Sequence, residues 1–185
     1  MIAGPPPGPV PVAALALFVV VLAAQRIGEL IHSARNVKRL VQRGARQAGA
    51  RHFPLLVAVH VLFPTLLVAE VLALGARPGS YWPMWLGTWL AAQALRYAAV
   101  GALGERWSVG IWVVPGETLV RRGPYRFLPH PNYLAVVLEL LAAPMLFGAW
   151  RTAIAIGALN LLALAIRIRA EERALRGGAP ASRAR

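Results

Sequence analysis

Long apolar runs separated by short basic stretches constrain this chain more than any other feature of its sequence. Three runs each have about the 20 residues that a helix needs to cross a bilayer core, and two shorter runs are separated by Gly148-Ala149-Trp150-Arg151. The five runs cover residues 10–31, 54–74, 81–103, 133–147 and 152–166. Because 58% of the 185 residues are hydrophobic and only 15% are charged, a soluble domain of this size could not bury the apolar surface in one core. The sequence therefore predicts an all-α, polytopic integral membrane protein with about five transmembrane helices, the last two forming a short helical hairpin.

The net charge of +13 could indicate nucleic-acid binding, but the positions of the charges argue against it. Arg and Lys gather between or after the apolar runs, at residues 35–51, 106–126 and 167–185, which is the distribution expected beside an anionic leaflet. Five spans put all three stretches on one face of the membrane, and the positive-inside rule makes this the cytoplasmic face. We therefore expect a multi-pass protein of the bacterial inner (plasma) membrane, with its N-terminus outside, its C-terminus in the cytoplasm and no nucleic-acid partner.

Scarce residue types exclude several kinds of site. The chain has no cysteine, which excludes disulfides, thiolate metal ligands and cysteine nucleophiles. It has four scattered histidines and no aspartate, so we expect no metal site.

Polar residues inside the apolar runs are costly in lipid and as a rule face a bundle interior or a cavity. For Glu29 and Arg96, which lie near predicted cytoplasmic ends, anchoring at the membrane interface is the favoured interpretation. Glu70 is expected to be structural. Glu139 and Asn160 lie within the last two runs, where an interhelical hydrogen bond and a role in substrate binding are equally open.

The residues that could carry chemistry lie in the polar stretch after residue 103 and beyond the last apolar run. Gly123-Pro124-Tyr125 and His130-Pro131-Asn132-Tyr133 put turn residues beside His and Tyr at the start of an apolar helix, which Asn132 is predicted to cap. Glu171 and Glu172 follow the last run, and an antiparallel helix pair returns them beside His130. The pattern predicts a pocket at the cytoplasmic face for a ligand with a cation, a carboxylate and a ribose. A solvated basic face with a polar turn is the structural alternative.

In order and spacing these residues resemble the isoprenylcysteine carboxyl methyltransferase family and its phospholipid methyltransferase relatives. The family pattern is Gly-Pro-Tyr, then Arg-His-Pro-x-Tyr, a helical hairpin and a terminal Glu-Glu, and the resemblance covers residues 104–175. It implies that S-adenosylmethionine is the cofactor and that Arg167 and His130 act in catalysis. It also implies a set of cofactor-binding residues, namely Tyr125, His130, Pro131, Tyr133, Glu171 and Glu172.

The chain departs from the family pattern at one position. Pro129 stands where the family has the arginine before His-Pro, which removes a bidentate partner for a carboxylate or another anion. Arg126 or Arg122 is the expected substitute.

The resemblance also divides the chain into three segments. Residues 1–103 are expected to form three N-terminal transmembrane helices, 104–176 the methyltransferase core, and 177–185 a disordered basic tail.

The activity we expect is O-methylation of a lipophilic acceptor, which enters from the membrane lipid while the cofactor enters from the cytoplasm. A carboxylate acceptor needs no base, whereas a phenol or enol needs His130 or a glutamate to remove its proton. The Ala-, Arg-, Gly- and Pro-rich composition is typical of a GC-rich bacterial genome, and this favours a small polyketide or phenolic lipid over a prenylcysteine-like carboxylate.

Two other functions stay open. One is phospholipid N-methylation, and the other is a non-catalytic membrane transport or scaffold role, although the sequence shows no internal repeat of the kind that transporters carry. The oligomeric state is not predicted.

Overall fold

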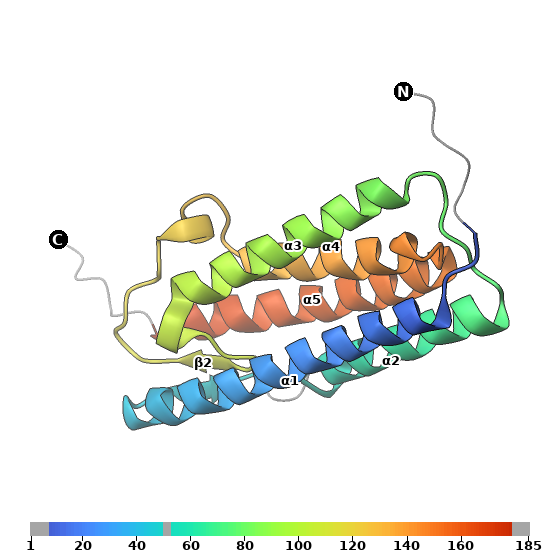
Figure 1. Cartoon of the computed structure of the whole chain (residues 1–185). Coiled ribbons are helices and arrows are strands. Elements are labelled where there is room, and N and C mark those ends of the chain that lie inside the picture. Colours follow the sequence, from blue (N-terminus) through green and yellow to red (C-terminus); the bar gives the residue numbers. More distant parts are fainter. Residues whose placement is uncertain (1–7, 50–52, 179–185) are drawn as a thin grey trace.

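The computed structural model describes residues 8–49 and 53–178, which form five long helices with a small sheet and two single-turn helices (Figure 1). In chain order the elements are α1 Val12–Gln42, β1 Arg46–Ala48, α2 Phe53–Ala73, α3 Trp82–Leu103, η2 Gly104–Arg106, β2 Ile111–Val113, η3 Gly123–Arg126, α4 Pro131–Leu146 and α5 Trp150–Gly178. Of the predicted basic tail, only its first two glycines are described, as the end of α5. The rest of the tail, and Arg51 of the first basic stretch, lie outside the described residues.

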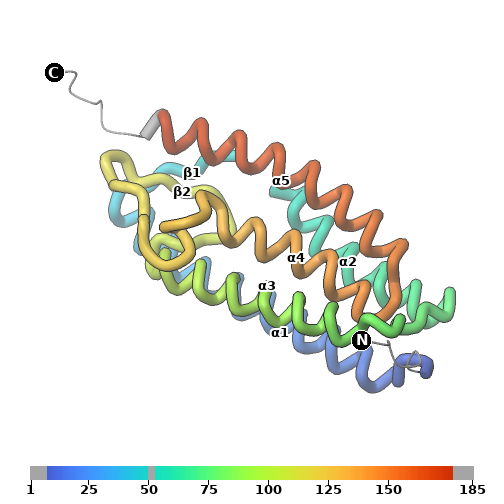
Figure 2. Tube along the Cα trace, turned by 90° about the horizontal axis from the view of Figure 1, so that it is seen from above, coloured from blue at the N-terminus to red at the C-terminus, as the bar shows by residue number. Residues whose placement is uncertain are grey.

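The five helices run alongside one another as a bundle, which confirms the largely helical fold (Figures 1 and 2). Helix α4 packs between α3 and α5, and α2 packs on α5. By length and composition α1, α2 and α5 can each cross a membrane, and α4 is a shorter apolar helix. A two-stranded sheet is the one departure from the predicted all-α fold within the described residues.

Two helices are longer than the sequence predicted. Helix α1 has 31 residues, about 46 Å at 1.5 Å per residue, so it continues about 16 Å beyond a 30 Å bilayer core. Helix α5 has 29 residues, so the prediction of a short hairpin is wrong for α5 and holds only for the 16-residue α4. The apolar residues of each run end where the helix is expected to leave the lipid. Arg, Lys, Gln and Glu are good helix formers, so both helices continue through the basic stretches that follow.

A cluster of ion pairs lies inside the bundle and joins α1, α3 and α4. Arg96 pairs with Glu139 and lies 3.3 Å from Glu29, while Arg26 pairs with Glu139 and lies 2.6 Å from Glu29. Arg96 is 3% exposed and Glu139 is 1% exposed, so the prediction that Glu29 and Arg96 anchor the protein at the interface is wrong. Two cations and two anions neutralise one another, which is how charged groups are tolerated in a membrane interior.

The connection between α4 and α5 is held by Glu70 of α2. The Glu70 carboxylate accepts hydrogen bonds from the backbone N–H groups of Arg151 and Thr152, at 3.0 and 2.7 Å, and from the Thr152 hydroxyl. These N–H groups belong to the first turn of α5 and have no partner within the helix, and the helix dipole favours a negative charge there. The expectation that Glu70 is structural is confirmed.

A tight turn precedes this cap. Gly148 has φ +73°, and a Cβ atom at this position would overlap the Arg77 carbonyl, so glycine is required by both conformation and space.

The small sheet joins two connections that are far apart in sequence. Strand β1 pairs antiparallel with β2 in the register Arg46–Val113, Gln47–Trp112 and Ala48–Ile111. The segment after α1 is therefore fixed to the segment between α3 and α4, and together they form one wall at this end of the bundle.

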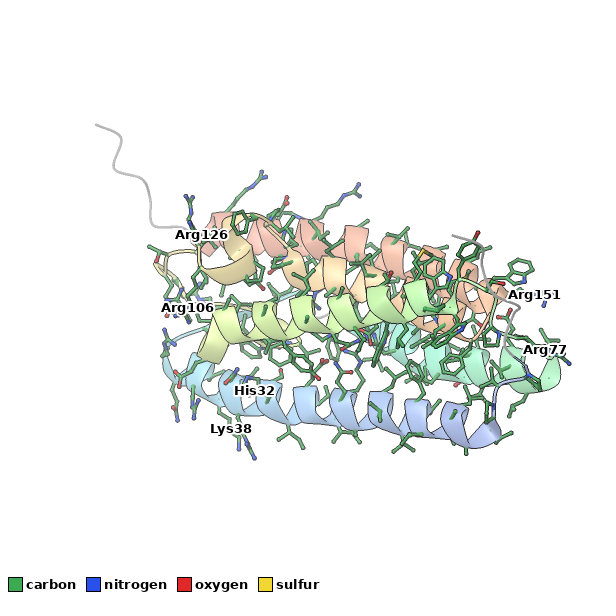
Figure 3. The ribbon with its side chains drawn as sticks, turned by 45° about the horizontal axis from the view of Figure 1, so that its top comes forward. His32, Lys38, Arg77, Arg106, Arg126 and Arg151 are labelled. Carbon is green, nitrogen blue, oxygen red and sulfur yellow. The ribbon has the colours of Figure 1, made fainter. Side chains whose placement is uncertain are left out.

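The described cations are distributed unevenly between the two ends of the bundle. Arg106, Arg126 and Lys38 lie at the end where α1 and α5 finish, and Arg77 and Arg151 lie at the opposite end (Figure 3). We call the first of these the site end. The number of spans and the side of the membrane that the site end faces stay predictions.

Replacing Glu139 with Gln leaves the buried guanidinium group of Arg96 and the half-buried one of Arg26 without a full counter-charge. We expect it to lower the free energy of unfolding by roughly 3–5 kcal/mol, the range for breaking a buried pair from one side. Thermal and denaturant unfolding in detergent measures the effect. Glu105→Gln is the matched control because Glu105 pairs with Arg39 at the exposed surface, where a pair contributes about 0–1 kcal/mol. Equal effects of the two substitutions would contradict a structural role for the cluster.

Candidate active site

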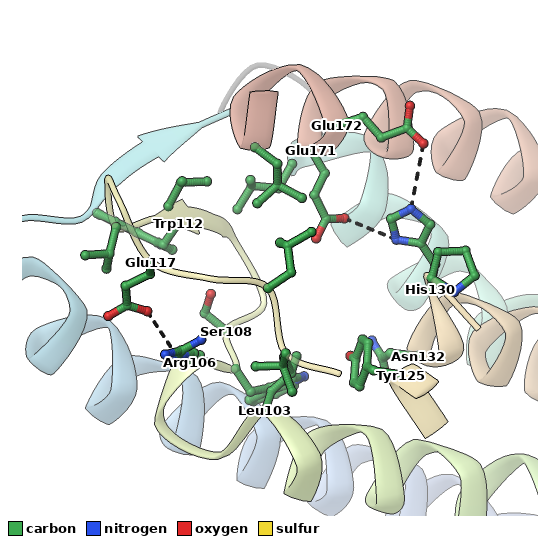
Figure 4. Close-up of a pocket in the computed structure, with 18 of the residues that line it drawn as sticks. Leu103, Arg106, Ser108, Trp112, Glu117, Tyr125, His130, Asn132, Glu171 and Glu172 are labelled. Carbon is green, nitrogen blue, oxygen red and sulfur yellow. Dashed lines mark ion pairs between the residues drawn. The ribbon is translucent and has the colours of Figure 1, made fainter. Parts of the chain in front are cut away.

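A cavity of about 470 Å³ opens at the site end, where α3 ends and α4 begins (Figure 4). This volume is within the usual range for sites that bind small molecules or cofactors. One wall comes from α4 and α5, and the other comes from the segment between η2 and η3. The polar side chains of the wall formed by η3, α4 and α5 are Tyr125, His130, Asn132, Tyr133, Arg167, Glu171 and Glu172.

His130 lies between the two glutamates at the end of α5. His130 directly precedes Pro131, the first residue of α4. Its ring therefore lies where the start of α4 meets the end of α5. His130 Nδ1 lies 3.7 Å from Glu171 Oε2, and Nε2 lies 3.9 Å from Glu172 Oε1. The antiparallel return predicted from the sequence is therefore confirmed, and it brings both carboxylates to the same imidazole.

Tyr133 and Arg167 complete a connected group. The Tyr133 hydroxyl donates to the Glu171 carboxylate and accepts a hydrogen bond from Arg167 Nε at 2.8 Å. The rings of His130 and Tyr133 stack with their centroids 5.1 Å apart, and the Arg167 guanidinium carbon lies 5.4 Å from the centroid of the Tyr133 ring. Each side chain is thus held by another, which keeps the wall ordered in advance of binding.

Tyr125 projects into the same cavity from η3. Burial, with a smaller contribution from the negative charge of Glu171, raises the pKa of Tyr125 to about 12. The phenol therefore stays protonated at physiological pH and can donate a hydrogen bond to a ligand.

Helix α1 holds the opposite wall, and this contribution was not predicted from the sequence. Asn36 Nδ2 donates to the carbonyl groups of Gly104 and Trp107, at 3.1 and 2.9 Å, and Ser33 Oγ accepts from the Val109 N–H at 2.9 Å. The Val109 carbonyl in turn accepts from Arg167 Nη2 at 2.7 Å. Ser33 and Arg167 are therefore linked through a single residue, Val109. The only sequence signal was two small polar residues three apart, on one helix face within a basic stretch.

The far rim of the cavity is fastened by charges. Arg106 Nε lies 3.0 Å from Glu117 Oε2 and its Nη1 donates to the Thr118 carbonyl at 2.8 Å, and Arg43 of the segment after α1 also pairs with Glu117. These contacts hold Glu117 and Thr118 in place at the edge of the cavity, which both residues line.

Not every predicted site residue faces the cavity. Pro131 is buried at the start of α4 and does not line it. Asn132 does not cap α4, because the helix begins at Pro131 and Asn132 is its second residue; no side chain caps this helix. Asn132 lines the cavity instead. Its buried Oδ1 has no hydrogen-bond partner among the described residues.

The arginines expected to replace the one lost at Pro129 also lie elsewhere. Arg122 donates to the Ala102 carbonyl at 2.7 Å, and neither Arg122 nor Arg126 lines the cavity. Arg106 and Arg121 line it. Arg106 uses its Nε and Nη1 for Glu117 and Thr118, so Arg121 and the Nη2 of Arg106 are the donors available to a carboxylate on this side.

The donors and acceptors of the cavity fit S-adenosylmethionine. Two carboxylates suit an ammonium group and ribose hydroxyls, arginines suit a carboxylate, and the free acceptor of Asn132 suits an exocyclic amine or hydroxyl.

Fold and cavity together define a helical protein with membrane-length apolar helices and a polar ligand site at one end of its bundle. The sequence model of the isoprenylcysteine carboxyl methyltransferase (ICMT) family matches residues 85–177. The chain is also 38% identical over 159 residues to the uncharacterized protein YpbQ of Bacillus subtilis (strain 168), which covers 86% of this chain and 95% of that protein. An uncharacterized protein of Haemophilus influenzae (strain ATCC 51907 / DSM 11121 / KW20 / Rd) is 31% identical over 155 residues, covering 83% and 90%.

The chain therefore belongs to the ICMT family, as the resemblance of its motifs indicated. No solved structure matches it. The matched region begins within α3, so α1, with its contacts to the cavity wall, lies outside it.

Replacing Ser33 with Ala removes the acceptor for the Val109 N–H and leaves that donor unpaired, at a cost of about 1–3 kcal/mol. We expect faster amide hydrogen exchange in the peptide 104–110, measured by mass spectrometry in detergent. Ser33→Thr keeps the hydroxyl and is the matched control, with exchange close to that of the wild type. Unchanged exchange in Ser33→Ala would show that this bond does not hold the wall.

Proposed function

We propose that the protein is an integral membrane methyltransferase that uses S-adenosylmethionine to O-methylate a lipophilic acceptor. Membership of the ICMT family supports the reaction class. The observation that carries the proposal is the connected group of His130, Tyr133, Arg167 and Glu171, with Glu172 beside it, on one wall of the cavity.

The carboxylates of Glu171 and Glu172 hold the positively charged parts of the cofactor and its ribose in this proposal. Arg106 and Arg121 on the opposite rim are the partners for its carboxylate, in place of the arginine that Pro129 replaces. When bound, S-adenosylmethionine supplies an electrophilic methyl group, which passes to the acceptor oxygen while the sulfonium becomes a neutral thioether. Because the displacement is in line, the protein contributes mainly by holding the two reactants at the correct distance and by excluding water.

Arg167 and His130 act on the acceptor. Two nitrogens of the Arg167 guanidinium are engaged by Tyr133 and Val109, and the third nitrogen, Nη1, is left to orient an acceptor carboxylate or phenolate. His130 is the base for a phenol or enol, and its imidazole lies 3.7 Å from Glu171 and 3.9 Å from Glu172.

The acceptor we rank first is a small polyketide or phenolic lipid. A prenylcysteine-like carboxylate comes second and a phospholipid amine third. We further propose that the site end faces the bacterial cytoplasm, since the described basic residues concentrate there (Figure 3).

Isothermal titration of purified, detergent-solubilised protein with S-adenosylmethionine tests the cofactor site. We expect saturable binding, weakened at least about tenfold in His130→Ala and in Glu172→Ala, since a hydrogen bond to a charged group contributes about 1.5–3 kcal/mol. Glu105→Ala is the control, because Glu105 carries the same charge at the site end but does not line the cavity. Folded wild-type protein that binds no cofactor would refute the proposal and favour a transport or scaffold role.

Product analysis tests the acceptor class. Membranes that contain the protein receive methyl-labelled S-adenosylmethionine and, in separate reactions, an alkylresorcinol or alkylpyrone, a prenylcysteine analogue, or phosphatidylethanolamine. We expect label on the oxygen of the phenolic or pyrone lipid, and less of it in His130→Ala, which lacks the base. Methylated phosphatidylethanolamine as the sole product would exclude O-methylation.

A further inference from the structure

Exposed apolar side chains occur outside the long helices, in the segment that connects β2 to α4. Leu119 is 63% exposed and Phe127 is 81% exposed, and Leu128 beside it is also exposed. Apolar surface on the outer faces of the long helices is explained by lipid. Phe127 and Leu128 do not line the cavity, and Leu119 lines it while staying largely exposed. Neither the cavity nor packing accounts for this apolar surface in one short connection, and such surface marks an interaction site.

The position of this segment along the bundle shows what it can touch. At η3, a Cβ atom on Gly123 would lie 3.1 Å from Ala102 Cβ and 4.0 Å from the Ala98 carbonyl oxygen, and Arg122 bonds to the Ala102 carbonyl. The segment therefore packs on the side of the last turns of α3 and does not project beyond its end, as the short yellow helix before α4 shows (Figure 1).

The depth of η3 follows from the length of α3. From Trp82, Ala98 is about 24 Å along the helix and Ala102 about 30 Å, at 1.5 Å per residue. A bilayer core is about 30 Å thick. With α3 crossing the bilayer, as predicted for residues 81–103, and with Tyr81 and Trp82 at one interface, η3 lies at the boundary between acyl chains and headgroups of the other leaflet.

The charges of the segment match that depth. Arg121, Arg122 and Arg126 alternate with the apolar residues, and the sequence has no acidic residue between Glu117 and Glu139. The Arg126 guanidinium carbon lies 5.7 Å from the centroid of the Phe127 ring. Apolar side chains interleaved with cations are typical of segments that lie in the plane of an anionic membrane surface.

We propose that residues 119–128 form a membrane-inserted lip of the cavity. Leu119, Phe127 and Leu128 enter the acyl boundary of the leaflet at the site end, and Arg122 and Arg126 lie among the lipid phosphates. Leu119 and Arg121 also line the cavity, so the insertion places its mouth where a lipophilic acceptor is dissolved. This last consequence rests on the proposed function, whereas the insertion itself does not.

The experiment uses the absence of cysteine from the chain, which allows single-cysteine variants to carry one nitroxide each. The full-length protein is reconstituted in vesicles of phosphatidylcholine and phosphatidylglycerol. Collisions of the nitroxide with oxygen, which concentrates in lipid, are compared with collisions with a water-soluble nickel chelate. Tyr97→Cys is the lipid reference, since Tyr97 is 59% exposed on α3, and Lys38→Cys is the aqueous reference, since it lies on the part of α1 beyond the core.

We expect the labels at Phe127→Cys and Leu119→Cys to favour oxygen over the chelate, as at Tyr97→Cys. Labels that favour the chelate as strongly as Lys38→Cys would overturn the proposal. In vesicles of phosphatidylcholine alone we expect both labels to shift toward the aqueous reference, and an unchanged depth would overturn the role of the arginines. Titration of the same labelled proteins with S-adenosylmethionine is read separately, so a failure of the proposed function is distinguishable from a failure of the lip to insert.

Discussion

The ion cluster of Arg26, Glu29, Arg96 and Glu139 fixes where α1 lies, and the site depends on that position. The outer face of α1 is apolar, and lipid satisfies such a face in any orientation, so apolar surface alone does not set the rotation or height of a helix in a bilayer. Charges do, because each must meet its partner or stay desolvated without one. A turn or a slide of α1 would separate Arg26 from Glu139 of α4 and Glu29 from Arg96 of α3, so one arrangement is strongly preferred.

The same face of α1 then reaches the cavity. Residues 26, 29, 33, 36 and 40 are spaced by three or four, which places them in one stripe along the helix. The first two belong to the ion cluster, Ser33 and Asn36 hold the segment from Gly104 to Val109, and Leu40 lines the cavity. The ion cluster fixes the rotation and height of α1, and the same stripe of residues therefore fixes the position of the cavity wall that orients Arg167. Helix α1 nevertheless lies outside the region that matches the ICMT family model.

The residues around His130 were predictable because their convergence depends only on topology. Two antiparallel helices must bring the start of one beside the end of the other, whatever their rotation, and Glu171 and Glu172 accordingly meet His130. Glu29 and Arg96 were interpreted wrongly because snorkelling and burial differ only in the direction a side chain takes around its helix, and an almost uniformly apolar run does not reveal that direction. Strand pairing of β1 with β2 was missed for a related reason, since three-residue strands form through a partner distant in sequence and leave no periodic pattern.

The two walls of the cavity differ in a way that bears on its chemistry. The wall from α4 and α5 is mainly polar, whereas the wall from the segment between η2 and η3 carries Arg106, Glu117 and Arg121 and adds the apolar Trp112, Val113, Val114 and Leu119. Apolar side chains of this kind suit the apolar part of any ligand, whereas a site for lipid alone would not retain two carboxylates and several arginines that cost free energy to desolvate. Both walls are needed when a polar donor and a lipophilic acceptor must meet in one space. On the proposed function, the position of the cavity at the end of an apolar bundle, rather than inside it, lets each ligand approach from the phase in which it dissolves.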